Sequence, residues 1–234
     1  MSKTSAGILG VFSVICSAIL VFGASKIALD FQSMQRSVVV KGLSQKEVAA
    51  DVMILPINFN RASNDVGELY RQLESDKMAI LEFLQKRGIA NEDISVNAPS
   101  ITDKIANRYG GEERVAYRYA GSGNLLVYTR DIERGRKALE ELGELNEAGV
   151  LIRIEEYNTE YLYTKLNDIK PQMIEEATIN AREAAMKFAS DSQSKLGKIK
   201  RASQGQFSIE SRDRSTPHIK TIRVVSTIEY YLKD

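Results

Sequence analysis

A run of 22 residues without a charged side chain lies between Lys3 and Lys26. As an α-helix, this run would be about 33 Å long at ~1.5 Å per residue, which is enough to cross the ~30 Å apolar core of a bilayer. The run has no polar face, so we do not expect it to be a helix buried in a soluble domain. The apolar residues expected to contact lipid are Ile8, Leu9, Val11, Phe12, Val14, Ile15, Ile19, Leu20, Val21 and Phe22.

Residues 1–30 are either a retained anchor or a cleaved signal peptide. Only Lys3 and the amino terminus are basic before the apolar run, and the possible cleavage sites are poor because Phe22 disturbs the small-x-small pattern. The bulky Ile15 before Cys16 argues against lipoprotein processing. We therefore expect a retained anchor, with a cleaved signal as the alternative, followed by a tether over residues 31–36.

Composition excludes several kinds of chemistry. The chain has 32 Lys and Arg against 31 Asp and Glu, so a net charge of +1 argues against a nucleic-acid partner. It has one Cys and one His, so it can form neither an internal disulfide nor a Cys/His zinc site. We expect no metal and no cofactor. A Ser-His-Asp device would have to use His218.

Hydrophobic periodicity predicts an α+β fold, with a mixed or antiparallel sheet and about three helices, within one domain over residues 37–234. Gly42 and the polar residues 44–47 allow a bulge or a bend before Val48, and Pro56 predicts an edge or irregular position in the second strand. Ser63 or Asn64 is expected to cap the first helix. The expected strands are 37–42, 52–59, 94–101, 125–129, 150–163 and 222–232, with a hairpin within 103–123, and the expected helices are 64–87, 132–145 and 171–196.

The last expected helix carries mainly small residues on its inward face, which would let it lie close to a sheet. Pro171 suits its first turn and Gly197 is expected to end it. The predicted inward residues are Ala177, Ala181, Ala184, Ala185 and Ala189, together with Ile174 and Phe188.

Most polar motifs predict ordinary surface structure. The glycines at 110, 111, 121 and 123 lack the spacing of a phosphate loop and are expected in turns. Adjacent Glu pairs diverge on either a helix or a strand, so they predict solvated surfaces rather than acid/base dyads. His218 is expected in an exposed loop. The basic residues Lys195, Lys198, Lys200 and Arg201 could meet an anionic surface, but a solvated helix end is the favoured interpretation.

Self-association is predicted from two strands. The C-terminal strand alternates apolar and polar residues, and a strand over 150–163 would be near 45 Å long at ~3.3 Å per residue, longer than a compact body of roughly 40 Å. Projecting strand edges tend to pair with another chain. The expected contacts of a homo-oligomer are Tyr157, Tyr161, Tyr163, Ile228 and Tyr230.

The chain resembles the SIMPL-domain family, which includes YggE-like periplasmic proteins and a periplasmic immunogenic protein. The matching segments are 37–42 (SVVVKG), 48–51 (VAAD), 84–94 (LQKRGIANEDI) and 177–185 (ATINAREAA), with Leu196 and Gly197. The resemblance covers about residues 37–232. It implies an exported or anchored α+β protein facing the bacterial periplasm, often in ring-like oligomers and loosely associated with oxidative-stress defence. The family has no agreed reaction or catalytic residues, and Lys41 stands where it usually has a small residue.

The resulting expectation is a non-enzymatic protein with a single pass through the bacterial inner membrane and a periplasmic C-terminal domain. It would self-associate, meet protein partners that the sequence does not identify, and act in envelope or oxidative-stress homeostasis. The alternatives are a soluble periplasmic protein after signal cleavage, and a ligand-binding protein or hydrolase that uses His218 and nearby acidic residues.

Overall fold

The computed structural model describes residues 36–106, 116–153 and 158–233, so the expected anchor lies outside the described residues. The described chain divides into two compact units. The first unit comprises residues up to Lys46, Asn167–Ser208 and the segment from Ile222 onward. The second comprises Glu47–Leu166 and Ile209–Thr221. Both contain antiparallel strands and helices, which confirms the α+β class.

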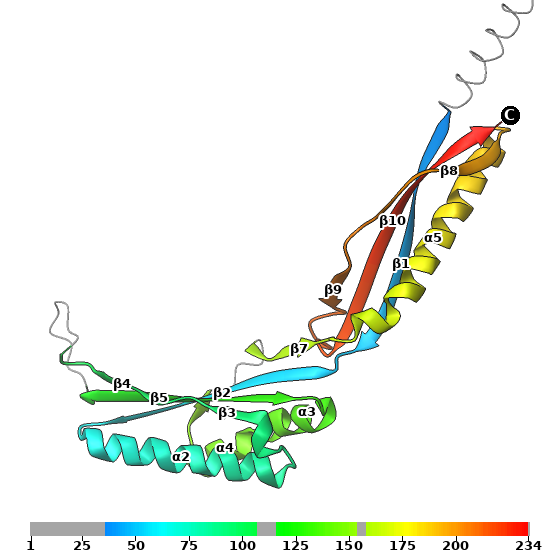
Figure 1. Ribbon diagram of the computed structural model, residues 1–234. Coiled ribbons are helices and arrows are strands. Elements are labelled where there is room, and N and C mark those ends of the chain that lie inside the picture. The colour runs from blue at the N-terminus through cyan, green and yellow to red at the C-terminus, as the bar shows by residue number, and fades with distance from the viewer. Residues whose placement is uncertain (1–35, 107–115, 154–157, 234) are drawn as a thin grey trace, which may run out of the picture. The chain divides into compact units, whose positions relative to one another are not determined.

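The first unit is a sheet covered by one helix. Its sheet has the strand order β1-β10-β8, and β9 also pairs with β10. The helix, α5, runs beside the sheet (Figure 1). The elements of the sheet and its helix are β1 (Ser37–Ala49), α5 (Leu166–Asp191), β8 (Lys195–Gln204), β10 (Ile219–Lys233) and β9 (Ser208–Ser211), of which Ile209–Ser211 belong to the second unit. As predicted, alternate residues of β10, from Ile222 to Tyr230, are buried on one face.

Gly42 is the point of closest approach between α5 and β1. A Cβ atom at Gly42 would lie 1.9 Å from the carbonyl oxygen of Ala177 and 2.4 Å from the amide nitrogen of Ala181. The first strand does not end at Gly42, where the expected strand over 37–42 ends, but continues to Ala49. The small helix face behaves as expected, with Ala177 and Ala181 fully buried. Glycine is required here by contact between two backbones.

The ends of α5 differ from the prediction. The helix begins at Leu166, five residues before Pro171, and ends at Asp191, where Gln193 takes a left-handed φ of 54°. Gly197 lies inside β8 instead of ending the helix. Phe188 is 60% exposed, whereas Met173 is buried on the inward face. The buried residues of α5 recur every four positions, and this stripe leaves Phe188 to one side.

The second unit is a sheet with helices α2, α3 and α4 on one face (Figure 1). The strand order is β3-β5-β2-β6, with β4 beside β5 and β7 beside β2. The elements are β2 (Val52–Ser63), α2 (Val66–Lys86), the 3-10 turn η1 (Asn91–Asp93), β3 (Ile94–Val96), β4 (Ser100–Asp103), β5 (Tyr119–Thr129), α3 (Ile132–Glu141), α4 (Gly143–Glu147), β6 (Ile152–Arg153) and β7 (Glu160–Leu162).

Helix α2 confirms the expected helix, but its cap is Asp65. The Asp65 carboxylate accepts the N–H of Glu68 at 2.7 Å. One turn of this helix carries the buried Asp76, which accepts hydrogen bonds from Nε and Nη2 of Arg61 on β2, at 2.5 and 2.7 Å. These bonds raise the pKa of Arg61 above its ordinary value. The pair fixes α2 along β2, because two parallel bonds tolerate little sliding.

The long strand expected over 150–163 is wrong. The described part forms two short strands, β6 and β7, and both pair with β2. Arg153 pairs with Asn58, whereas Glu160 pairs with Ile54. The two pairing residues are seven positions apart along the chain, but their partners on β2 are only four positions apart. One continuous strand cannot have both registers. Pro56 lies between the parts of β2 that pair with β6 and with β7, and on its other side it pairs with Leu126 of β5 in an unbroken register.

Two glycines expected in turns lie inside β5. A Cβ at Gly121 would be 2.6 Å from Cδ1 of Leu73, and one at Gly123 would be 2.1 Å from the Phe59 ring. Both glycines make room for neighbouring core side chains. Gly110 and Gly111 lie outside the described residues.

Two other expected elements are divided. The strand expected over 94–101 becomes β3 and β4, whose registers against β5 differ by one residue around Pro99. The helix expected over 132–145 becomes α3 and α4, separated at Leu142. The expected hairpin is confirmed in its stem, where Asp103 of β4 pairs with Tyr119 of β5.

We predict that Gly42→Ala lowers the free energy of unfolding by about 1–3 kcal/mol, because its methyl group overlaps the backbone of α5. The measurement is the midpoint of urea unfolding. Gly143→Ala is the matched control, since a Cβ there meets nothing within 4 Å. Equal midpoints for the Gly42→Ala variant and the unmodified protein would contradict the proposed close contact.

Candidate functional site

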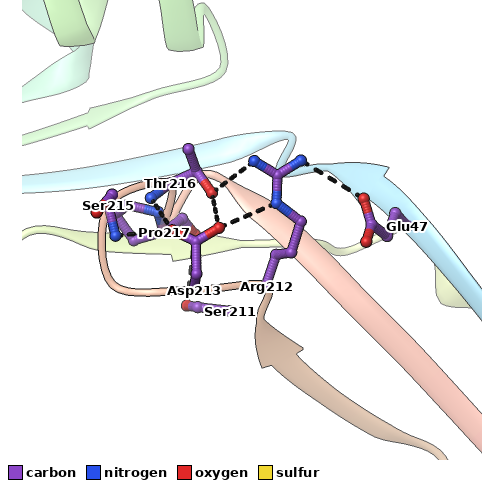
Figure 2. A network of polar contacts seen from close by, with 7 residues as sticks. All are labelled: Glu47, Ser211, Arg212, Asp213, Ser215, Thr216 and Pro217. Atoms are coloured by element: carbon purple, nitrogen blue, oxygen red, sulfur yellow. Dashed lines mark hydrogen bonds and ion pairs between the residues drawn. The ribbon is translucent and has the colours of Figure 1, made fainter.

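The loop before β10 is held by a polar network around Asp213 (Figure 2). Its carboxylate accepts the N–H groups of Ser215 and Thr216 at 2.8 and 2.7 Å, Nε of Arg212 at 3.0 Å, and the hydroxyl of Thr216. The Thr216 hydroxyl and Arg212 hold the pKa of Asp213 well below its ordinary value. Arg212 also reaches Glu47 at 3.5 Å. These hydrogen bonds hold the shape of the loop. Because its pKa is lowered, the Asp213 carboxylate is a poor proton acceptor.

His218 follows this network and is half-buried rather than exposed. Its backbone carbonyl accepts the N–H of Ala50 at 2.8 Å, and its ring meets the Tyr161 ring edge-on, with 6.0 Å between centroids. Burial is the main cause that lowers the pKa of His218 below its ordinary value, and the positive charge of Arg136 is the second cause. Among the described residues, no hydroxyl or carboxylate forms a hydrogen bond with the ring. The geometry therefore brings no nucleophile to His218.

Most residues expected at an oligomer contact lie in the chain's own cores. Tyr161 is 7% exposed in the core of the second unit, and Ile228 and Tyr230 are buried in that of the first. These three side chains are not available to a second copy, because packing inside the unit covers them. Tyr163 is half-buried, and Tyr157 lies outside the described residues.

The basic segment 195–201 lies on a strand, not at a helix end as favoured by the sequence. Lys200 of β8 bonds Glu229 of β10 at 2.8 Å, and Ser37 of β1 donates to the same carboxylate at 2.6 Å. The Lys200 bond is the main cause that lowers the pKa of Glu229. The three residues link all three strands across the sheet face that α5 does not cover. Sequence reasoning missed this linkage, because no local pattern relates residues so far apart.

The uncovered face of this sheet also carries exposed apolar side chains. Along β1, Val40, Gly42 and Ser44 are buried, so the alternate residues Val39 and Leu43 point away from α5. Val39 is 61% exposed and Leu43 is 41% exposed. The sequence does not reveal this alternation, because the exposed Val39 and Leu43 are apolar whereas the buried Ser44 is polar.

The open face of the second unit's sheet holds a shallow pocket of about 370 Å³. Four small polar side chains, Asn60, Ser100, Thr102 and Ser122, line it together with apolar residues that include Leu151. Arg61 is the one ionisable residue among the described residues of the lining, and its guanidinium forms an ion pair with Asp76. The lining offers hydrogen bonds without a group suited to proton transfer.

Two classes of feature are absent from the residues that the structure describes. Within 36–106, 116–153 and 158–233, no three or more His, Cys, Asp or Glu side chains are grouped to hold a metal ion. In the same ranges, no helix is both long and apolar enough to cross a membrane. The predicted anchor residues, 8–22, lie outside these ranges.

The described residues form two layered α+β units with antiparallel sheets. The sequence model of the SIMPL family, described as a protein of unknown function (DUF541), matches residues 38–226. The chain belongs to the SIMPL family. The match extends through segments of both units. No curated protein matches the chain.

We predict that the protein loses stability as the pH falls from 7.5 to 5.5, because of its single His. The folded pKa of His218 lies below 6.5, so below that pH the unfolded chain binds a proton that the folded chain resists. The measurement is the thermal midpoint as a function of pH. His218→Gln should flatten this part of the curve. An unchanged slope in the variant would show that His218 is not the responsible group.

Proposed function

We propose that this protein is a membrane-tethered, self-associating component of the bacterial envelope, with a periplasmic body and a role in envelope or oxidative-stress homeostasis. The observation that carries the proposal is a sheet whose two edges and one face are left open by the described residues, in a chain that also has a 22-residue charge-free segment before its first strand. This combination suits a protein that acts by contact at a membrane. The stress role follows from what the family resemblance implies.

Both edges of the first unit's sheet support self-association. Arg36 bonds Leu232 and Ala50 bonds His218, so β1 runs antiparallel to β10. β8 also runs antiparallel to β10, and the two edge strands therefore have the same direction. Among the described strands, each of them pairs with β10 alone. An edge β8 meeting the β1 of a second copy would extend the sheet head to tail, which gives rings where the rotation closes.

The alternative of a hydrolase based on His218 lacks a supporting geometry. The ring faces Tyr161, while the nearest loop carboxylate, Asp213, is held by Arg212 and Thr216. A general base must reach the proton that it takes within about 3 Å, or through one water. We therefore favour the contact function over the catalytic one.

For the tether, we expect the full chain to remain in the membrane fraction after alkaline carbonate extraction, with its N-terminus still ahead of residue 8. The physical reason is the charge-free span, which is long enough for a bilayer, together with its poor cleavage sites. Sequencing of the mature N-terminus completes the test. A soluble protein that begins near Ala24 would show that the segment is a cleaved signal.

For self-association, we expect the detergent-solubilised chain to have a mass above 26.1 kDa that is stable over micromolar concentrations. Single cysteines in a Cys16→Ser background identify the edges: Val39→Cys reports β1 and Ser203→Cys reports β8. With a short bis-maleimide, a mixture of the two should crosslink, whereas each alone should not. Met78→Cys, 60% exposed on α2, is the control. A single-chain mass throughout, without crosslinks, would rule out edge pairing.

A further inference from the structure

The strands of the first unit's sheet are strongly basic. Within the parts of β1, β8 and β10 that belong to this unit, eight Lys and Arg residues stand against one acid, Glu229. Helix α5, on the other face, has five acids and three bases. The chain's near-neutral total of +1 therefore conceals a local separation of charge.

Most of the basic side chains share the face that α5 leaves open. On β1 and β10, these basic residues alternate with residues that are buried against α5. On β8, they are paired in register with, or hydrogen-bonded to, residues of β10 that point away from α5. Together they form what we call the basic face: Lys41, Lys195, Lys200, Arg201, Arg223 and Lys233. Glu229 is bonded to Lys200 and offsets one of these six charges. Counted over the described residues, the formal charge of the face is 6 − 1 = +5.

Apolar side chains lie among these charges. Val39 and Leu43 are exposed on the same side of β1 as Lys41, and the Tyr231 ring lies 5.7 Å from Nζ of Lys200. From residue 223 to 233, β10 extends about 33 Å at ~3.3 Å per residue. The result is a long strip that mixes cationic and apolar groups, as do surfaces that bind membrane interfaces.

The strip is near the expected membrane segment along the chain. Fourteen residues, 23–36, separate Phe22 from Ser37, the first residue of β1. Even fully extended, they span no more than about 50 Å. The first unit is therefore confined to the layer directly beside the bilayer that would hold the tether.

We propose that the basic face binds the anionic headgroups of phospholipids in the membrane that carries the tether. Lys and Arg near a surface are attracted to acidic lipids, and exposed Val39 and Leu43 can enter the interfacial layer. This inference rests on the proposed tether, because the tether supplies the proximity. A second copy's α5, with a net charge of 3 − 5 = −2, is a weaker counterpart than a continuous anionic surface.

The test uses the full chain in lipid nanodiscs of phosphatidylcholine, with or without about one third phosphatidylglycerol. Acetylation of each lysine is followed by mass spectrometry. We expect phosphatidylglycerol to slow acetylation of Lys41 and Lys233 about fivefold, and about 0.5 M salt to restore it. Lys86 and Lys137 of the second unit are exposed internal controls and should keep their rates.

A charge-reversal pair confirms the assignment. Lys41→Glu with Arg201→Glu should abolish the protection of Lys233, while the matched change Lys86→Glu with Lys137→Glu should preserve it. Equal urea midpoints establish that both variants fold, and the salt dependence of the unmodified protein tests the proposal independently of any variant.

Three outcomes would overturn the inference. Equal acetylation rates in the two kinds of disc would show that acidic lipid does not cover the face. Equal protection in pure phosphatidylcholine would exclude recognition of headgroup charge. Protection in detergent that grows with protein concentration would assign the face to a second copy. Failure of the tether is distinguishable from all three, because the chain would then not copurify with the discs.

Discussion

Helix α5 packs on one face of its sheet through a stripe of four buried alanines that follows Met173 along the helix. With no side chain at Gly42, the backbones of β1 and α5 approach closely, and Ala177 and Ala181 are completely buried. One helix covers one face of the strands β1, β10 and β8. A second helix would be needed to cover the other, and among the described residues no further helix belongs to this unit.

In the second unit, ion pairs of two arginines hold α2 in position. Arg61 holds the middle of the helix to β2 through the buried carboxylate of Asp76. At the helix end, Arg87 bonds Glu141 of α3 and Glu144 of α4, with its guanidinium 3.6 Å above the centre of the Phe83 ring. Removing one member of such a pair leaves a partly buried charge without its counterion, so the arginines act as positional constraints.

Local patterns in the sequence predicted what depends on neighbouring residues. The period of α2, the alternation of β10 and the alanine face of α5 were all sufficient to identify their elements. The errors arose where a distant partner decides the local structure. Gly42 suggests the end of a strand until α5 is placed against it, and Gly121 suggests a turn until Leu73 occupies the space beside it. The alternation in 150–163 could not show that β2 accepts its two halves in different registers.

The candidate surface was predictable to a smaller degree. The sequence predicts a solvated helix end for the basic segment 195–201, with an anionic surface as the alternative, and that position relates the segment to no strand. As β8, the segment lies beside β10 and adds to Lys41 and Arg223, which are remote in sequence. The charge of a sheet face is the sum of the charges that its neighbouring strands contribute. Only the strand order reveals which residues belong to it.

The contact at Gly42 also limits how this protein can vary during evolution. Positions 42, 177 and 181 share one gap between two backbones, so their sizes are not independent. A larger residue at position 42 requires α5 to move outward, and that movement would open space beside every alanine down to Ala189. Replacing Gly42 with a larger residue would therefore require several simultaneous substitutions in the first unit. Relatives with a bulkier strand residue at this position should differ along the entire inner face of the helix.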